Sequence, residues 1–568
     1  MEINTFTAIA IIIGSGAILA YISSLLKQPL IIGYVLAGII IGPILGFIDP
    51  VSNQELIRLF SEIGIAFLLF SVGLEVDISR LKRVGLIATL GGLARMGLSF
   101  SIGYFVANLI GLTGMQPIYF GLMLSFGSTM VVIKLLSDNK ELDTLHGRIV
   151  VGILLMEDFI AITSLTILAN TNNLAHIIRI IPIIRNLTLL FVILLLARLL
   201  LPLMFKQAAT NTELLFVLST GIAMIFAIIF PIIGFPMSIG VFLAGLLLGN
   251  LPYSVEISGR VKPLKDFFMV LFFVSLGLSF TLVQLSMIWR PLLIVVLLAL
   301  ILNPIIIGLI TMVFGYTSKT AFFSGSIMGE VSEFALILLT QGLVLGHIDN
   351  NFYSLGILAA IITMSITPYT FKYRYTTYKI FKPALRMIER IFRRSPTPDR
   401  ELKPRGHEVI LIGYDRLGYG ILRRLIRMKK DFIVVDYNPD VISRLIEHGI
   451  PCIYGDISDP ETLEELNLKK AKMIISTAPS MRDNLFLIEK GKKINKDLII
   501  IVTAQTVEEA LGLYKAGADY VILPHLLGGE HAGILLEEVG EDLDKLIATK
   551  IQHIKELRLK KELHPRHL

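Results

Sequence analysis

The chain has 568 residues, of which 54% are hydrophobic and 17% charged, with a single cysteine and a formal net charge of +7. Charged side chains make up 9% of residues 1–371 but 31% of residues 372–568, whereas an ordinary soluble domain carries about 25%. This composition excludes a purely soluble enzyme, a disordered chain and a disulfide-stapled scaffold.

The first part of the chain is predicted to be an all-α polytopic membrane domain, because a transmembrane helix needs about 20 apolar residues. Lys and Arg in the connecting loops are divided eleven to four between alternate sides, and the richer side faces the cytoplasm. We therefore expect a multi-pass protein of the plasma membrane lipid bilayer, with its N-terminus outside and its C-terminal part in the cytoplasm. The roughly 13 predicted spans are residues 4–26, 29–48, 55–77, 84–111, 117–137, 147–169, 183–205, 212–231, 233–250, 264–285, 289–315, 319–345 and 351–373.

Two motifs recur in the same order along the membrane domain. Gly33–Gly42 recurs as Gly240–Gly249, 207 residues later, and Ser71–Leu74 recurs as Ser275–Leu278, 204 residues later. Seven spans separate the equivalent motifs, an odd number, so the two halves are predicted to be inverted repeats. Such repeats are typical of secondary transporters with a mid-membrane substrate site. The alternative is chance recurrence of the small residues that allow close helix packing.

Two adjacent carboxylates, Glu157 and Asp158, lie near the middle of the span 147–169. Ionisable groups in a membrane are costly and are functional candidates by default. A carboxylate in this position can bind either a proton or a bare monovalent cation, and that competition is the minimal chemistry of an antiporter. The alternative is a structural pair neutralised by Arg95 or by another buried cation.

The span 117–137 is interrupted by Gly127, Ser128 and Thr129. Such a stretch favours a discontinuous helix whose freed carbonyls and hydroxyls help to dehydrate a cation. The alternative is that both hydroxyls bond only to their own helix. The repeat places the span 319–345 opposite, where Glu330 and Glu333 would line a second break. We therefore predict a crossed pair of discontinuous helices.

Six stretches carry a family resemblance: Pro29–Pro43, Leu68–Asp77, Gly240–Leu246, Ser128-Thr129, Glu157-Asp158 and Glu333–Ala335. With these motifs, residues 5–375 resemble the second branch of the monovalent cation–proton antiporters, which includes the Kef potassium–proton antiporters and sodium-transporting relatives. The resemblance implies a homodimer in which a core domain slides as an elevator past a scaffold, with no cofactor for transport.

The resemblance makes Asp158 the essential ion carboxylate, which alternates between a proton and K⁺ or Na⁺. Glu157 would tune Asp158 or supply a second charge. The cavity would be shaped by Ser128, Thr129, Asn303 and Glu333. Kef relatives usually have Gln in place of Glu157, and many relatives have Lys where this chain has Asn303. These departures leave the transported cation and the proton stoichiometry open.

The C-terminal part is predicted to be a Rossmann-like, doubly wound α/β domain, because short apolar runs alternate with helical segments. We expect a membrane domain over 1–375, a basic linker over 376–405, the α/β domain over 406–530 and a helical arm over 531–568. The expected strands are residues 408–413, 432–436, 451–454, 472–477, 498–503 and 520–523.

A candidate nucleotide site lies at the first turn of this domain. Gly413 and Gly418 bracket the turn and Asp436 follows 18 residues later, as in the dinucleotide fingerprint in which glycines admit the pyrophosphate and an acid holds a ribose hydroxyl. Asp415 replaces the middle glycine, and Asp456 follows the third strand. Residues 407–525 resemble the regulatory nucleotide-binding domain of potassium channels and transporters. The resemblance implies regulatory NAD(H), AMP or a similar ligand; a purely structural dimerisation fold is the alternative.

The hypothesis from the sequence is a homodimeric antiporter that exchanges K⁺ or Na⁺ for H⁺ and is tuned by a cytoplasmic nucleotide-sensing domain. It is not an enzyme, since no hydride-transfer site is evident. A ligand-gated K⁺ conductance is one alternative, but the chain has no Thr-Val-Gly-Tyr-Gly filter. A membrane-anchored nucleotide sensor is another, and it leaves Asp158 unexplained. Histidine spacing predicts no metal site, and the basic charge at the membrane end predicts no nucleic-acid partner.

Overall fold

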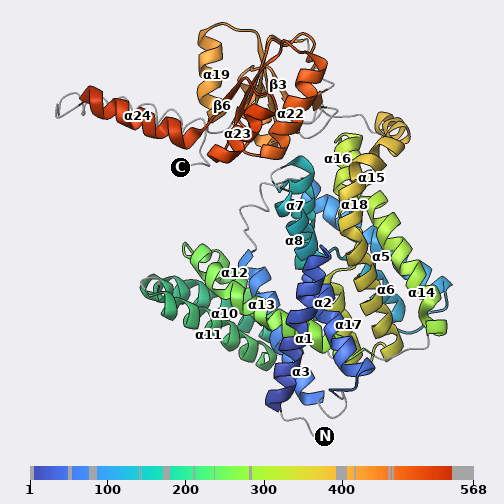
Figure 1. The fold of residues 1–568 in the computed structure, drawn as a ribbon. Helices are drawn as coiled ribbons and strands as arrows, with labels where there is room; N and C mark the ends of the chain where they lie inside the picture. Colours follow the sequence, from blue (N-terminus) through green and yellow to red (C-terminus); the bar gives the residue numbers. More distant parts are fainter. Residues whose placement is uncertain are drawn as a thin grey trace. The chain divides into compact units, whose positions relative to one another are not determined.

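The computed structural model describes most of the chain in two compact units, Met1–Ser395 and Pro396–Leu568. Figure 1 shows both units, which are treated separately below. The described residues are 5–48, 54–75, 86–139, 141–142, 144–169, 180–208, 211–233, 235, 237–280, 285–391, 406–414, 417–457, 462–463, 466–539 and 550.

All the regular secondary structure described in the first unit is helical, which confirms the predicted class of the membrane domain. By length and composition, seven segments of the described residues can cross a membrane, and three shorter apolar helices accompany them. The helices are α1 (Thr5–Leu25), α2 (Leu30–Ile39), η1 (Ile40–Ile44), α3 (Gln54–Glu75), η2 (Ile87–Gly91), α5 (Gly92–Leu109), α6 (Gln116–Ser125), α7 (Thr129–Asp138), α8 (Leu145–Ala169), α10 (Ile180–Ala208), α11 (Thr212–Ile232), α12 (Met237–Gly249), α13 (Ser254–Leu278), α14 (Leu285–Leu297), η4 (Leu298–Leu302), α15 (Asn303–Val313), α16 (Ser318–Ser326), α17 (Glu333–Val344) and α18 (Asn350–Ile391).

The helices of this unit pack in two groups (Figure 1). In one group α3 packs against α12 and α13, while α2 packs against α1 and α13. In the other group α5 packs against α6, α15 against α16, and α16 and α17 against α18. The predicted discontinuous helices, α6–α7 and α16–α17, both belong to the second group.

Two glycine contacts in the first group reflect the internal repeat. A Cβ on Gly38 of α2 would lie 2.0 Å from the carbonyl oxygen of Val274 on α13, so these backbones touch. A Cβ on Gly245 of α12 would likewise lie 2.2 Å from the carbonyl oxygen of Phe70 on α3. Gly38 and Gly245 occupy equivalent positions in the repeated motif, and each packs on a helix that carries the other motif. The repeat therefore relates each contact to the other, as expected for two halves with pseudo-twofold symmetry.

The helix α18 is 42 residues long, which gives it a length of roughly 63 Å at 1.5 Å per residue. A bilayer core is about 30 Å thick, so this helix continues well past a membrane. It ends at Ile391 and thus includes the first half of the predicted basic linker. The backbone amide of Ser318, at the start of α16, donates a 3.1 Å hydrogen bond to Glu389 near the end of α18.

The second unit contains a parallel sheet of order β3-β2-β1-β4-β5-β6, which confirms the predicted doubly wound fold and all six predicted strands. Its strands are β1 (Val409–Ile412), β2 (Phe432–Asp436), β3 (Cys452–Tyr454), β4 (Met473–Ser476), β5 (Ile499–Thr503) and β6 (Tyr520–Ile522). Its helices are α19 (Leu417–Arg427), α20 (Pro439–Glu447), α22 (Met481–Ile494), α23 (Val507–Lys515) and α24 (Pro524–Val539).

Both faces of this sheet are buried. Successive side chains of a strand point to opposite faces, and those of β1 enter two different cores. Ile410 and Ile412 of β1 pack in one core with Leu487 of α22. Val409 and Leu411 pack in the other core, which contains helix residues of α19 and α20. The predicted helical arm begins within α24, and its part beyond Val539 lies outside the described residues except for Lys550.

Candidate ion site at the crossing of two broken helices

The first break separates α6, which ends at Ser125, from α7, which begins at Thr129. Phe126 is extended, with φ −107° and ψ 127°. The carbonyl oxygens at the end of α6 are occupied by side chains from neighbouring helices: that of Leu124 accepts from Asn303 Nδ2 at 2.9 Å, and that of Ser125 accepts from Arg95 Nη1 at 2.8 Å. In this conformation, carboxylates and hydroxyls are therefore the better candidates for contact with an ion.

The second break separates α16 from α17, and Glu333 is the first residue of α17. Ser128 Oγ donates a 2.5 Å hydrogen bond to Glu333 Oε2, and the amide of Met130 donates a 3.3 Å bond to Oε1. These contacts bring the two predicted breaks together. The positive ends of the α7 and α17 helix dipoles meet at this point, and the carboxylate of Glu333 compensates both.

Asp158 lies on α8 and is 2% exposed. The hydroxyl of Thr129, at the start of α7, lies 3.0 Å from Asp158 Oδ1 and 3.1 Å from Oδ2. Thr129 therefore links α7 to α8, and Ser128 links α7 to α17. Neither hydroxyl bonds only within its own helix, as the alternative interpretation of this motif required.

Glu157 faces a different set of groups from Asp158. Arg95 Nη1 on α5 forms an ion pair with Glu157 Oε1, and both side chains are fully buried. The amide of Gly127, in the first break, donates a 2.9 Å hydrogen bond to Glu157 Oε2. The Arg95–Glu157 pair therefore holds the broken segment between α5 and α8.

Asn303 begins α15 and is 1% exposed. Its Oδ1 accepts a 2.8 Å hydrogen bond from Ser99 Oγ on α5, while its Nδ2 donates to Leu124. Asn303 thus joins α5, α6 and α15 at the end of the first half-helix. Ser99 was not predicted from the sequence, because a hydroxyl within an apolar helix carries no signal of its partner.

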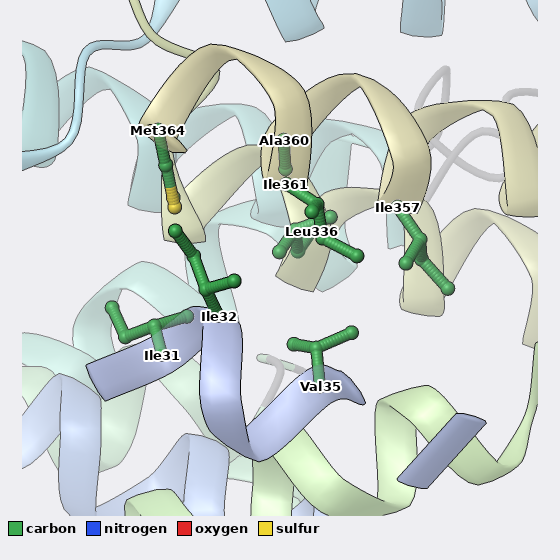
Figure 2. Close-up of a pocket in the computed structure, with 8 residues that line it drawn as sticks. All are labelled: Ile31, Ile32, Val35, Leu336, Ile357, Ala360, Ile361 and Met364. Carbon is green, nitrogen blue, oxygen red and sulfur yellow. The ribbon is translucent and has the colours of Figure 1, made fainter. Parts of the chain in front are cut away.

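A small hollow between α2, α17 and α18 is lined only by apolar side chains, among them Val35, Leu336 and Ile357 (Figure 2). It offers no carboxylate or hydroxyl to an ion. The candidate ion site is therefore the crossing of the two breaks, where Asp158 and Thr129 meet.

A second charged cluster lies outside the membrane spans, between α7 and α8. Glu141 accepts hydrogen bonds from Arg374 Nη2 of α18 and from His146 at 2.9 Å. Burial raises the pKa of Glu141, but the hydrogen bond from His146 and the charge of Arg374 outweigh it and hold the pKa below its ordinary value. Arg374 also stacks 3.8 Å above the ring of Phe371.

The predicted nucleotide site lies at the carboxyl edge of the sheet, beside the point where β1 neighbours both β2 and β4. Gly413 has φ +83°, and a Cβ on Gly418 would lie 2.0 Å from the Gly413 carbonyl oxygen, so this turn requires both glycines. Asp436 Oδ2 accepts a 2.9 Å hydrogen bond from the amide of Tyr414. The structure therefore brings Asp436 to the turn. Asp415 lies outside the described residues, and Asp456 is half-buried just after β3.

Residues 12–373 match the family described as sodium/hydrogen exchanger, transmembrane, and residues 409–524 match the TrkA-N domain. The chain belongs to the sodium/hydrogen exchanger family. It is a cation/proton antiporter that carries a TrkA-N domain, which confirms the family resemblance of both parts. Within the described residues, no cluster of His, Cys, Asp and Glu could hold a metal ion.

Two relatives of this antiporter match both parts of the chain. It is 27% identical to YbaL of Escherichia coli (strain K12) over 533 residues, a match that covers 89% of this chain and 93% of YbaL. It is 27% identical over 542 residues to the glutathione-regulated potassium-efflux system protein KefC of Escherichia coli O45:K1 (strain S88 / ExPEC), covering 91% of this chain and 83% of KefC. The structure of the sodium proton antiporter MjNhaP1 from Methanocaldococcus jannaschii at pH 8 covers 67% of this chain and 98% of its own, with 19% identity and a TM-score of 0.48.

Proposed function

We propose that this antiporter exchanges K⁺ for protons and that Asp158 binds the two ions in turn. The observation that carries the proposal is the buried position of Asp158 beside the hydroxyl of Thr129, where the two broken helices cross. Since Arg95 compensates the adjacent Glu157, the two neighbouring carboxylates have different roles: Glu157 supports the break and Asp158 exchanges ions. The choice of K⁺ rests on the name of the relative KefC.

Charge balance defines the exchange step at Asp158. A protonated Asp158 is neutral, and its proton leaves when K⁺ binds to the carboxylate, so the same net charge occupies the site in either form. The positive end of α7 would oppose a cation near Thr129, but Glu333 accepts from both Ser128 and Met130 and offsets that dipole. Glu333 and Ser128 therefore make the first turn of α7 compatible with a cation.

The proposal is tested by proton flux in proteoliposomes after pulses of K⁺ or Na⁺. Wild-type protein is expected to alkalinise the lumen when K⁺ moves into it, because protons leave in exchange, and Asp158→Asn is expected to abolish the exchange. Asp138→Asn, at an exposed position at the end of α7, is the matched control and should exchange as wild type does. Full exchange by Asp158→Asn would refute the role of Asp158. Exchange with Na⁺ but not with K⁺ would show that Na⁺ is the transported cation.

We also propose that the TrkA-N domain binds an adenine nucleotide such as NADH or AMP as a regulator. The support is the turn Gly413–Gly418 beside Asp436, at the carboxyl edge of a parallel sheet where such ligands bind. NADH or AMP should raise the unfolding temperature of the full-length protein, and Asp436→Ala should remove the shift. Asp431→Ala changes an aspartate that precedes β2, at the strand end away from Asp436, and this variant should keep the shift in unfolding temperature. Equal shifts in the two variants would contradict nucleotide binding at Asp436.

We infer a homodimer whose core slides against a scaffold, with the N-terminus outside and the TrkA-N domain in the cytoplasm. The loop charges and the two helix groups support this arrangement. Cys452 is the single cysteine, so Cys452→Ser gives a cysteine-free background for labelling. A cysteine added next to Met1 should react with a membrane-impermeant reagent when the reagent is applied from outside and not when it is applied from the cytoplasmic side. Reaction from the cytoplasmic side alone would show that the topology is the opposite of the one inferred.

A further inference from the structure

Glu330 is a buried acid that the exchange at Asp158 does not use. It lies in the second break, between the end of α16 at Ser326 and the start of α17 at Glu333, and it is 0% exposed. Thr367 of α18 lies 2.9 Å from Glu330 Oε2. Glu330 Oε1 has no hydrogen-bond partner among the residues that the structure describes.

The hydrogen bonds around Thr367 indicate which oxygen carries a hydrogen. Thr367 Oγ1 is within bonding distance of two acceptors, Glu330 Oε2 at 2.9 Å and the carbonyl oxygen of Thr363 at 3.0 Å. A hydroxyl has one hydrogen to donate, so it cannot satisfy both contacts fully. If Glu330 is protonated, its own O–H donates to Thr367, and Thr367 donates to Thr363. Both contacts are then complete hydrogen bonds.

Glu333 provides an internal contrast three residues away. Each of its carboxylate oxygens accepts a hydrogen bond, one from Ser128 and one from Met130, and it sits at the positive ends of two helices. That setting suits an ionised carboxylate. For Glu330, by contrast, Thr367 contacts Oε2 and Oε1 has no partner among the described residues. Among those residues the charged groups that act on Glu330 are Glu333, of like charge, and Arg95, which is paired with Glu157.

We propose that Glu330 is a proton-binding site separate from Asp158: its carboxyl group is neutral in the folded protein and joins the second break to Thr367 of α18. A buried carboxylate without a counter-ion is strongly destabilising, whereas the neutral acid can donate a hydrogen bond. The bound proton therefore replaces a counter-ion. When alkaline pH removes this proton, an uncompensated charge remains in the second break and the fold loses stability.

The test is infrared spectroscopy of the purified full-length protein at neutral pH, compared with Glu330→Gln and Glu333→Gln. The wild type should show the C=O stretch of protonated carboxyl groups. Glu330→Gln should remove the component that belongs to Glu330, and Glu333→Gln should retain it. This measurement does not depend on transport, so it is independent of the proposed role of Asp158. Persistence of the whole band in Glu330→Gln would overturn the proposal.

Two further measurements cover both outcomes for the folding of Glu330→Gln, and the first applies if that variant does not fold. Thr367→Val keeps the carboxyl group but removes its acceptor, and it should shift the same band to higher frequency; an unshifted band would contradict the assignment. Where Glu330→Gln does fold, its unfolding temperature should fall less between neutral and alkaline pH than that of the wild type. An equal fall in both proteins would contradict the uncompensated charge.

Discussion

The ion pair between Arg95 and Glu157 gives the strongest stability prediction. Both side chains are fully buried, so water does not screen the charges, and Arg95 also donates to the carbonyl oxygen of Ser125 at the first break. Arg95→Met would leave Glu157 as an uncompensated buried charge. Removing one partner of such a pair typically costs about 3–5 kcal/mol. This corresponds to an increase in the unfolding equilibrium constant of roughly two to three and a half powers of ten.

The double variant Arg95→Met/Glu157→Gln separates this effect from a loss of packing. The glutamine introduced in place of Glu157 can still accept from the amide of Gly127 while no charge remains. Because a buried pair can often be replaced by neutral groups at little cost, most of the lost stability should return. Reversible unfolding in mixed micelles measures the free energy of unfolding of the wild type and of both variants. A single variant within about 1 kcal/mol of the wild type, or a double variant as unstable as the single one, would refute the reasoning.

Two further predictions concern packing and pH. Gly38→Ala places a Cβ 2.0 Å from a backbone carbonyl of α13 and should lower the unfolding temperature by several degrees, whereas Gly14→Ala, which has nothing within 4 Å, should leave it unchanged; equal effects would contradict the close helix contact. Since the pKa of Glu141 is held below its ordinary value by His146 and by a nearby arginine against the effect of burial, its stabilisation is present at neutral pH and is lost as the pH falls through the lowered pKa. Glu141→Gln should therefore be less stable than the wild type at neutral pH and approach it in acid, in thermal unfolding across pH; a gap that widens in acid would contradict this.

The strands of the TrkA-N domain were predictable because each is a short apolar run in a doubly wound pattern. Residues such as Ile410 and Leu411 are both buried, on opposite faces of the sheet. The broken helices were predictable for a similar reason, since Gly127 and Ser128 interrupt an apolar run. These local patterns need no knowledge of distant contacts.

The partners of the buried acids were not predictable from local patterns. Arg95 entered the sequence analysis only as an alternative counter-ion, and nothing in its surroundings indicated that it faces Glu157 and not Asp158. Thr367 stands 37 residues from Glu330, in a helix whose hydroxyls could equally have bonded to their own backbone. Such pairs depend on how helices far apart in sequence rotate against each other, which composition and spacing do not determine.

The central claim is that a cation and a proton compete for Asp158, and it can be measured without a membrane. We would add KCl to purified protein in weakly buffered detergent solution and follow the released protons with a pH indicator. The account predicts about one proton released per K⁺ bound by the wild type, the same release by Glu330→Gln, and none by Asp158→Asn. Proton release by Asp158→Asn equal to that of the wild type would contradict it.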